Sequence, residues 1–142
     1  MIYTNMTKKA LKICFKAHIN QVDKTGVPYV FHPFHLAEQM DDEESICLAL
    51  LHDVVEDTSI TFKDLINEGF SEKIISALRL LTHLDSTPYM EYIQKIKENP
   101  LAKKVKLADL RHNSDLSRLD LSVDKIPSKL DLYKIAIQYL ED

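Results

Sequence analysis

Residues 49–58 read Ala-Leu-Leu-His-Asp-Val-Val-Glu-Asp-Thr, which places one imidazole and three carboxylates within six residues of a largely apolar stretch. In a helix, His52 and Glu56 would lie four residues apart on one face, as would Asp53 and Asp57. Because an unpaired charge beside a hydrophobic core is costly, these side chains need partners. A divalent metal and a water-activating pair of carboxylates would provide them. The alternative, a helix end whose acids face solvent, fits Asp57 but not the His-Asp pair.

Two other segments could complete a metal site. His32 lies in the stretch Tyr-Val-Phe-His-Pro, and Asp109 lies in Leu-Ala-Asp-Leu-Arg-His-Asn. With His52 and Asp53 they make two imidazoles and two carboxylates, a mixed donor set that suits manganese, iron or zinc. Four protein ligands on an octahedral ion would leave positions for water and substrate. Metal-assisted hydrolysis at phosphorus is the chemistry that such a site supports.

Three separated motifs carry a family resemblance. They are Gly-Val-Pro-Tyr-Val-Phe-His-Pro at 26–33, Leu-Leu-His-Asp-Val-Val-Glu-Asp-Thr at 50–58, and Lys-Leu-Ala-Asp followed by His-Asn between 106 and 113. In this order they resemble the HD phosphohydrolase superfamily. The residues around the His-Asp pair are more specifically similar to the hydrolase domain of RelA/SpoT proteins and to stand-alone small alarmone hydrolases. The resemblance covers about residues 7–120.

The resemblance implies a metal-dependent phosphohydrolase that removes the 3′-pyrophosphate from guanosine tetra- or pentaphosphate. It implies a divalent metal, Mn²⁺ before Fe²⁺ or Zn²⁺, bound by His32, His52, Asp53 and Asp109. Glu56 and Asp57 are expected to be catalytic, because paired carboxylates near a metal can take a proton from water and deliver one to a leaving oxygen. Candidate substrate contacts are Lys24, Lys106, Arg111 and Asn113. For each of these four, an ordinary solvated side chain is the alternative.

Two departures from the family pattern concern the substrate. Asp23-Lys24 stands where the RelA/SpoT hydrolases carry a basic pair, and Asp115 follows the late motif where they carry an arginine. Arg118, one turn later, could replace that arginine. These changes motivate the alternative of an HD phosphohydrolase acting on another nucleotide or phosphoester. A non-catalytic nucleotide-binding module is a further alternative, which the intact ligand and Glu-Asp sets argue against.

The remaining histidines do not fit the expected ligand set. His18, His35 and His83 are expected to be structural or solvent-facing. His112 precedes Asn113 as in the family pattern, and a supporting or packing role is expected for it.

Helical periodicity dominates the chain and predicts an all-α fold of about eight helices. The expected helices span about 7–21, 33–40, 42 through the His-Asp pair, 61–69, 71–83, 88–99, 101–119 and 127 to the last residues. We expect a single domain over 1–142, an HD-type helical bundle with its motif-bearing core at about 7–120. A bundle of this kind can direct ligands from several helices onto one metal.

Composition limits the classes of partner. The chain has 142 residues, a net charge of −4 and no basic block, so binding to a nucleic acid polymer is not expected. No signal peptide and no apolar run of membrane-spanning length are recognised, so we expect a cytoplasmic protein without a membrane partner. Cys14 and Cys47 lie in apolar helical contexts and are expected to be reduced. The expected partner is a small nucleotide substrate, and a homo-oligomer is possible.

Overall fold

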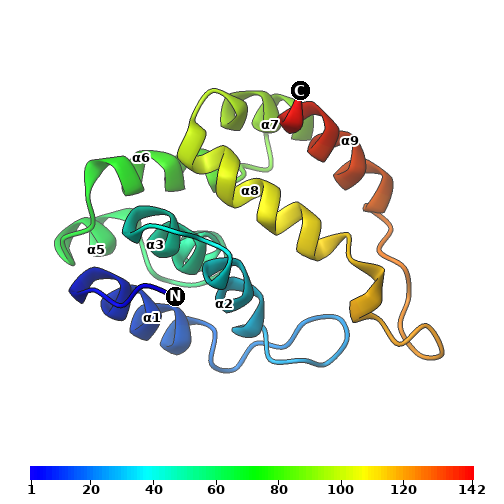
Figure 1. Cartoon of the computed structure of the whole chain (residues 1–142), viewed down its shortest axis with the longest axis horizontal. Coiled ribbons are helices and arrows are strands. Elements are labelled where there is room, and N and C mark those ends of the chain that lie inside the picture. Colours follow the sequence, from blue (N-terminus) through cyan, green and yellow to red (C-terminus); the bar gives the residue numbers. More distant parts are fainter.

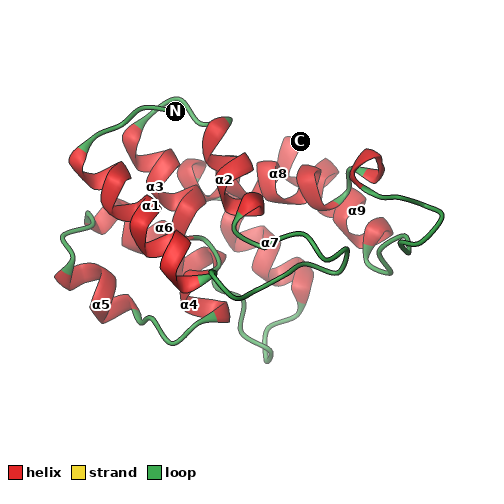
Figure 2. Cartoon of the chain, turned by 90° about the horizontal axis from the view of Figure 1, so that it is seen from below, coloured by secondary structure: helices red, strands yellow, loops and turns green.

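Nine α-helices and one short 3₁₀-helix form the regular structure of this computed structural model, which describes residues 1–142 (Figures 1 and 2). They are α1 (Asn5–Ala17), α2 (Phe31–Glu38), α3 (Glu43–Leu51), α4 (Val54–Asp57), α5 (Phe62–Asn67), α6 (Glu72–Leu81), α7 (Tyr89–Lys97), α8 (Pro100–Asn113), η1 (Leu116–Arg118) and α9 (Leu130–Glu141). No strand forms, and one isolated bridge pairs Val22 with Pro28. The expected all-α class is confirmed.

The central helix of the fold is α3. Every residue from Ser45 to Leu51 is buried, which is typical of a helix covered on all sides. It packs against α1, α2, α6 and α8, and Figure 1 shows it between α1 and α8. The C-terminal end of α3 therefore delivers the His-Asp pair into the interior of the bundle.

The longest helix, α8, completes the interior. Asn99 caps it by accepting a hydrogen bond from the backbone N–H of Ala102, and Pro100 occupies the first position, where a missing N–H costs nothing. This helix packs against α7 and α9 on one side and against α2, α3 and α6 on the other. These contacts bring Asp109 next to residues that lie far earlier in the chain.

The His-Asp pair lies between two helices, and the expectation that one helix carries it is wrong. Helix α3 ends at Leu51, His52 is its C-cap, and Asp53 precedes the single turn of α4. The imidazole Nδ1 of His52 donates to the carbonyl of Ala49 at 2.6 Å. Such a bond competes with continuation of the backbone ladder, and the φ and ψ of Asp53, −109° and 1°, leave the helical range.

Side-chain caps begin several of the helices. Asp42 caps α3, and Ser71 caps α6. Thr61 and Asp64 form a reciprocal capping box at α5, with aspartate in the place that glutamate usually takes. Gly69 has a φ of +95° after that helix, a conformation that favours glycine.

The ends of the first two helices differ from the expectation. Helix α1 begins at Asn5, two residues before the expected start, because Thr4 caps it and Thr7 completes the capping box from inside the helix. The helix stops at Ala17, well before the expected end near residue 21. Helix α2 begins at Phe31, so Pro33 lies within its first turn, where its missing N–H is still tolerated.

The last part of the chain is less helical than expected. Helix α8 ends at Asn113, six residues before the expected end. The Asp115 carboxylate accepts hydrogen bonds from the N–H and hydroxyl of Ser117, which start η1 in place of another α-helical turn. Helix α9 begins at Leu130, three residues after Pro127.

Candidate metal centre

His32, His52 and Asp109 converge from three parts of the bundle. His32 lies on α2, His52 ends α3 and Asp109 lies on α8; all three are buried. His32 Nε2 is 2.8 Å from Asp109 Oδ1, and His52 Nε2 is 3.6 Å from the same oxygen. One ligand atom from each residue lies within 4.8 Å of the other two, a spacing in which these donors could bind one ion.

Asp53 lies beside this group. Its Oδ2 is 3.0 Å from His52 Nε2 and accepts a hydrogen bond from the hydroxyl of Tyr29, in the loop before α2. The structure thus brings together all four residues that the sequence singles out as ligands. Tyr29 was not assigned a role from the sequence, although it belongs to the first motif.

His52 provides the observation that fits a metal best. Its Nδ1–H donates to the backbone of Ala49, so in the neutral imidazole, the form that binds a metal, the lone pair is on Nε2. That Nε2 is buried and has no hydrogen-bond donor as a partner, although Asp53 and Asp109 lie close to it. A buried acceptor nitrogen that faces two carboxylates would be satisfied by a cation.

One lysine and two hydrogen-bonding side chains contact the Asp109 carboxylate. Lys106 Nζ lies 2.9 Å from Oδ2, and the Asn113 amide donates to Oδ1 at 3.0 Å. Burial alone would raise the pKa of Asp109, but the charge of Lys106 and the hydrogen bond with His32 hold it well below its usual value. Asp109 is therefore ionised, as a metal ligand must be.

Glu56 and Asp57 form a second acidic group with Asp53, again with ligand atoms within 4.8 Å of one another. Glu56 Oε1 accepts the backbone N–H of His83 at 2.8 Å. Burial, reinforced by the neighbouring charge of Asp53, raises the pKa values of Glu56 and Asp57 above those of ordinary carboxyl groups. Carboxylates with raised pKa values beside a metal site are suited to proton transfer.

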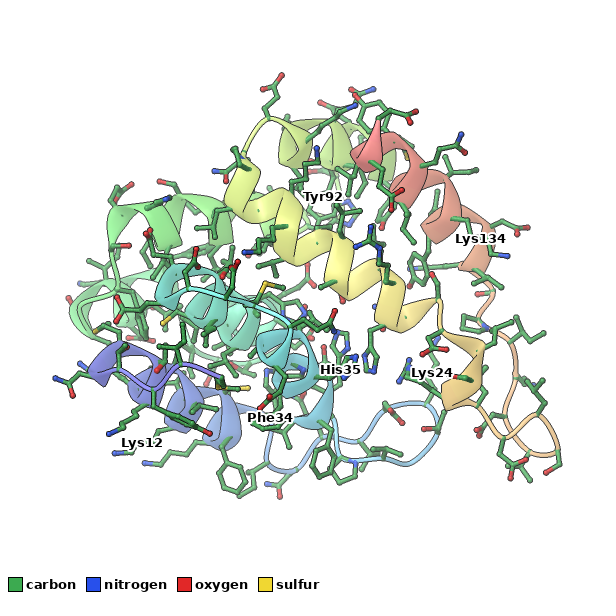
Figure 3. All side chains as sticks on the ribbon, viewed as in Figure 1. Lys12, Lys24, Phe34, His35, Tyr92 and Lys134 are labelled. Atoms are coloured by element: carbon green, nitrogen blue, oxygen red, sulfur yellow. The ribbon has the colours of Figure 1, made fainter.

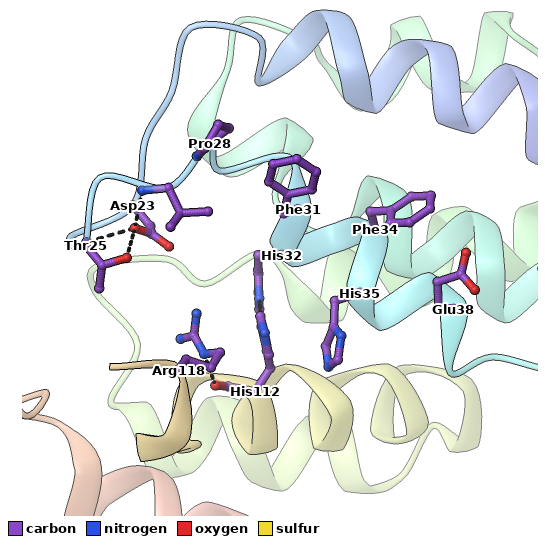
Figure 4. Close-up of a pocket in the computed structure, with 11 residues that line it drawn as sticks. Asp23, Thr25, Pro28, Phe31, His32, Phe34, His35, Glu38, His112 and Arg118 are labelled. Carbon is purple, nitrogen blue, oxygen red and sulfur yellow. Dashed lines mark hydrogen bonds between the residues drawn. The ribbon is translucent and has the colours of Figure 1, made fainter. Parts of the chain in front are cut away.

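Two cavities adjoin the cluster. The smaller, of about 20 Å³, is lined by polar side chains that include His52, Asp53, Glu56, Lys106 and Asp109. The larger, of about 420 Å³, opens on the other side of His32. Figure 4 shows the larger cavity between α2 and α8, with Phe31, Phe34 and His35 from α2 and with Asp23, Thr25 and Arg118 from the flanking segments.

The four candidate substrate contacts occupy different environments. Lys106 and Asn113 lie at the cluster but are bonded to Asp109. Arg111 is exposed and pairs with Glu141 of α9. Lys24 is exposed in the loop between α1 and α2 (Figure 3) and lines neither cavity. Their role in binding a nucleotide stays a prediction.

Arg118, which could replace the arginine missing from the late motif, lines the larger cavity. Its Nε donates to the backbone carbonyl of His112 at 2.9 Å (Figure 4). Asp23 lies in the same cavity, with Oδ1 occupied by hydrogen bonds from Thr25 and Val27. Asp23, which departs from the family pattern, and Arg118, which could replace its missing arginine, thus line the same cavity.

The other histidines are divided between supporting and structural positions. His112 Nδ1 lies 2.7 Å from His32 Nδ1, and His35 stacks on His112 with ring centroids 4.2 Å apart. His35 is exposed, as expected, but lines the larger cavity. His18 is buried and bonded to Gln21. Helical spacing could have indicated that His35 and His112 lie near the cluster, because His35 follows His32, and His112 follows Asp109, by three residues.

Comparison with known proteins agrees with this arrangement. The family model described as the HD domain matches residues 10–113. The chain belongs to the HD domain family. HD domains bind divalent metals, and this HD domain carries the His/Asp cluster with which one could be held.

Two curated relatives are similar over most of this HD domain. The guanosine-3′,5′-bis(diphosphate) 3′-pyrophosphohydrolase of Aquifex aeolicus is 32% identical over 118 residues, which cover 75% of this chain and 17% of the relative. The bifunctional (p)ppGpp synthase/hydrolase SpoT of Escherichia coli is 29% identical over 121 residues, again 75% of this chain and 17% of the relative. The chain thus spans about a sixth of the length of these relatives.

A solved structure extends the likeness to nearly the whole chain. It is the structure of a metazoan ortholog of SpoT, a protein that hydrolyses ppGpp and plays a role in starvation responses. Its TM-score is 0.75 at 25% sequence identity, and the match covers 99% of this chain and 85% of the other. The resemblance to the RelA/SpoT hydrolase domain is confirmed.

None of the helices has the length and apolar run needed to cross a bilayer.

Proposed function

We propose that this chain is a divalent-metal-dependent phosphohydrolase that removes the 3′-pyrophosphate from guanosine tetra- or pentaphosphate. The observation that carries the proposal is the buried His52 Nε2, which has no hydrogen-bond partner and lies close to the carboxylates of Asp53 and Asp109. The names of the two bacterial relatives and the hydrolysis of ppGpp by the metazoan ortholog of SpoT support the substrate.

His32, His52, Asp53 and Asp109 would hold the metal, with Mn²⁺ proposed before Fe²⁺ or Zn²⁺. The donor set of two imidazoles and two carboxylates supports this range of ions. A divalent ion bound there would supply Lewis-acid polarisation of a phosphoryl oxygen and activation of water. Lys106 and Asn113 would keep Asp109 ionised and oriented through the bonds they make to it.

Glu56 and Asp57 would act as the general base and general acid of the reaction. Water adds to the phosphorus bound to the 3′ oxygen, the bond from phosphorus to that oxygen breaks, and GDP and pyrophosphate leave. One carboxylate takes a proton from the water and one carboxyl group returns a proton to the 3′ oxygen, so the net proton count at the site is restored. The backbone N–H of His83 would hold Glu56 in place for this transfer.

The larger cavity between α2 and α8 would receive the nucleotide. It shares His32 with the metal centre and combines the apolar side chains of Phe31 and Phe34 with Asp23 and Arg118. Lys24, Lys106, Arg111 and Asn113 remain the predicted substrate contacts. Asp23 on the cavity wall also favours a second candidate, the same hydrolysis on another nucleotide or phosphoester.

Product analysis tests the proposal. Manganese-loaded protein is mixed with guanosine tetraphosphate, alongside Asp53→Ala and the surface control Asp131→Ala. The proposal predicts that the parent and the control release GDP and pyrophosphate and that Asp53→Ala does not. Release of nothing by a parent that binds manganese would contradict the alarmone substrate, and a panel of other nucleotides would then be screened. Absence of both metal binding and turnover would favour a non-catalytic nucleotide-binding module.

The proposal extends to the domain, the location and the partners of this activity. We propose that residues 1–142 act as one domain in the cytoplasm, on a small nucleotide and without a nucleic acid or membrane partner; a homo-oligomer is compatible with this. The family match over 10–113 supports the single domain, and the acidic net charge of −4 supports the lack of a nucleic acid partner.

A further inference from the structure

His112 contacts the metal centre without being one of its proposed ligands. Its Nδ1 lies 2.7 Å from Nδ1 of His32, with the ring planes 11° apart. Figure 4 shows the two rings edge-on and end to end between α2 and α8. A hydrogen bond between two imidazole nitrogens needs one N–H and one lone pair, so the two rings must be in complementary tautomers.

The tautomer of His32 decides whether it can bind a metal. Its Nε2 lies 2.8 Å from Asp109 Oδ1, at the centre of the cluster. With the proton on Nε2, His32 would donate to Asp109 and would have no lone pair to offer there. With the proton on Nδ1, the lone pair of Nε2 faces the cluster, and the Nδ1–H needs an acceptor. The structure places His112 Nδ1 where that acceptor is required.

We propose that His112 is a positioning residue that accepts the Nδ1–H of His32 and thereby keeps the His32 Nε2 lone pair directed at the metal. The inference rests on the proposed metal site. Partners behind metal-binding histidines fix the tautomer and the ring orientation, and carboxylates or carbonyls usually fill that position. Here a neutral imidazole fills it.

The surroundings of His112 hold it in that orientation. His35 stacks on the ring with centroids 4.2 Å apart, and Arg118 donates to the His112 carbonyl at 2.9 Å. Because His112 follows Asp109 by three residues on α8, the two side chains share a helix face. They approach His32 from one helix, Asp109 at Nε2 and His112 at Nδ1.

Two substitutions separate the hydrogen bond from packing. His112→Asn keeps an acceptor, because Oδ1 of asparagine lies at the same position along the side chain as Nδ1 of histidine, but it removes the ring. His112→Phe keeps a ring against His35 but has no acceptor. Circular dichroism first establishes that each variant folds, and titration calorimetry with Mn²⁺ then measures metal affinity without reference to any substrate.

The inference predicts that His112→Asn binds Mn²⁺ nearly as the parent does and that His112→Phe binds it about ten- to a hundredfold more weakly. A role in packing alone predicts the opposite order. Equal losses in both variants, parent-like affinity in His112→Phe, or a parent that binds no Mn²⁺ would overturn the inference.

A second measurement needs no variant. Two-bond ¹H–¹⁵N spectra of the parent loaded with diamagnetic Zn²⁺ report which imidazole nitrogen carries the proton. The inference predicts His32 protonated at Nδ1 and His112 at Nε2, and the reverse pattern in His32 would contradict it. A parent that shows this tautomer and binds Mn²⁺ but releases no pyrophosphate would refute the proposed function and support the inference.

Discussion

At the scale of single residues, Asp109 is the point on which the centre depends. Its Oδ1 lies 2.8 Å from His32 Nε2 and accepts a hydrogen bond from the Asn113 amide, and its Oδ2 forms an ion pair with Lys106. The Lys106 side chain is only 14% exposed, so the pair is largely desolvated. Breaking a buried pair by removing one partner leaves an uncompensated charge, which costs far more than an exposed pair contributes.

Replacing Lys106 is therefore expected to destabilise the metal-free protein. Lys106→Met should lower the free energy of unfolding by about 3–5 kcal/mol, measured by urea denaturation with a chelator present. The exposed Lys104→Met, which loses a surface pair with Asp41, is the control and should destabilise the protein far less, because both charges remain in water. Equal stability of the two variants would show that Lys106 is not needed to hold Asp109.

Glu56 is expected to act on the reaction and not on metal binding. Glu56→Gln should lower kcat for pyrophosphate release about 10²- to 10⁴-fold, with Mn²⁺ affinity close to that of the parent. Glu91→Gln, on the exposed face of α7, serves as the matched control. An active Glu56→Gln variant would exclude this residue from proton transfer.

The titration of Glu56 gives a separate test. Burial raises the pKa of Glu56 above its ordinary value of 4.5. In the metal-free parent the Glu56 carboxyl group should therefore titrate above pH 4.5, as measured by carbon-detected NMR, and this titration should be absent in Glu56→Gln. A Glu56 carboxyl group that titrates at or below its ordinary value would contradict the effect of burial.

At the scale of elements, the break between α3 and α4 positions the chemistry. The ordered end of α3 fixes His52, and the single turn of α4 directs Glu56 toward the loop that follows α6. Capping residues could be predicted from the sequence because caps depend on local spacing. The break could not, because it depends on the bond from His52 to Ala49 and on contacts between α3 and distant helices.

The cap of α3 is open to a direct test. Asp42 accepts the N–H of Ser45 at 2.8 Å, so Asp42→Ala should cost about 1 kcal/mol of stability at neutral pH. Hydrogen bonds from Ser45 lower the pKa of Asp42 in the folded state. Its contribution is thus complete above the unfolded-state pKa and disappears as pH falls through the lower, folded-state value. Denaturation curves of parent and variant should therefore converge in acid; a difference that is constant with pH would contradict this.

At the scale of the whole molecule, the bundle assembles one site from ligands that are 77 residues apart in sequence. The motifs predicted that these residues meet, because chemistry constrains the residue types that can bind a divalent metal. The supporting contacts of Tyr29, His83 and His112 were harder to predict, because each depends on the distance between segments that pack only in the folded chain. The pair of Lys106 with Asp109 is different, because the two residues lie three apart on one helix and their contact could have been predicted from that spacing.

A site assembled only in the folded state should link metal binding to folding. A ligand that binds only the native protein stabilises it by about 2.7 kcal/mol when its free concentration is a hundredfold above Kd. Added Mn²⁺ should therefore raise the Tm of the parent in calorimetry, whereas Asp53→Ala, compared with and without metal, should show little shift. An equal shift in both proteins would place the metal elsewhere.

The most direct measurement of the proposed reaction is hydrolysis of guanosine tetraphosphate in ¹⁸O-labelled water with Mn²⁺ present, followed by mass analysis and ³¹P NMR of the products. Attack at the phosphorus attached to the 3′ oxygen predicts GDP without label and pyrophosphate carrying one ¹⁸O. Release of orthophosphate, label in the GDP, or no product from a metal-loaded protein would contradict removal of the 3′-pyrophosphate by this centre.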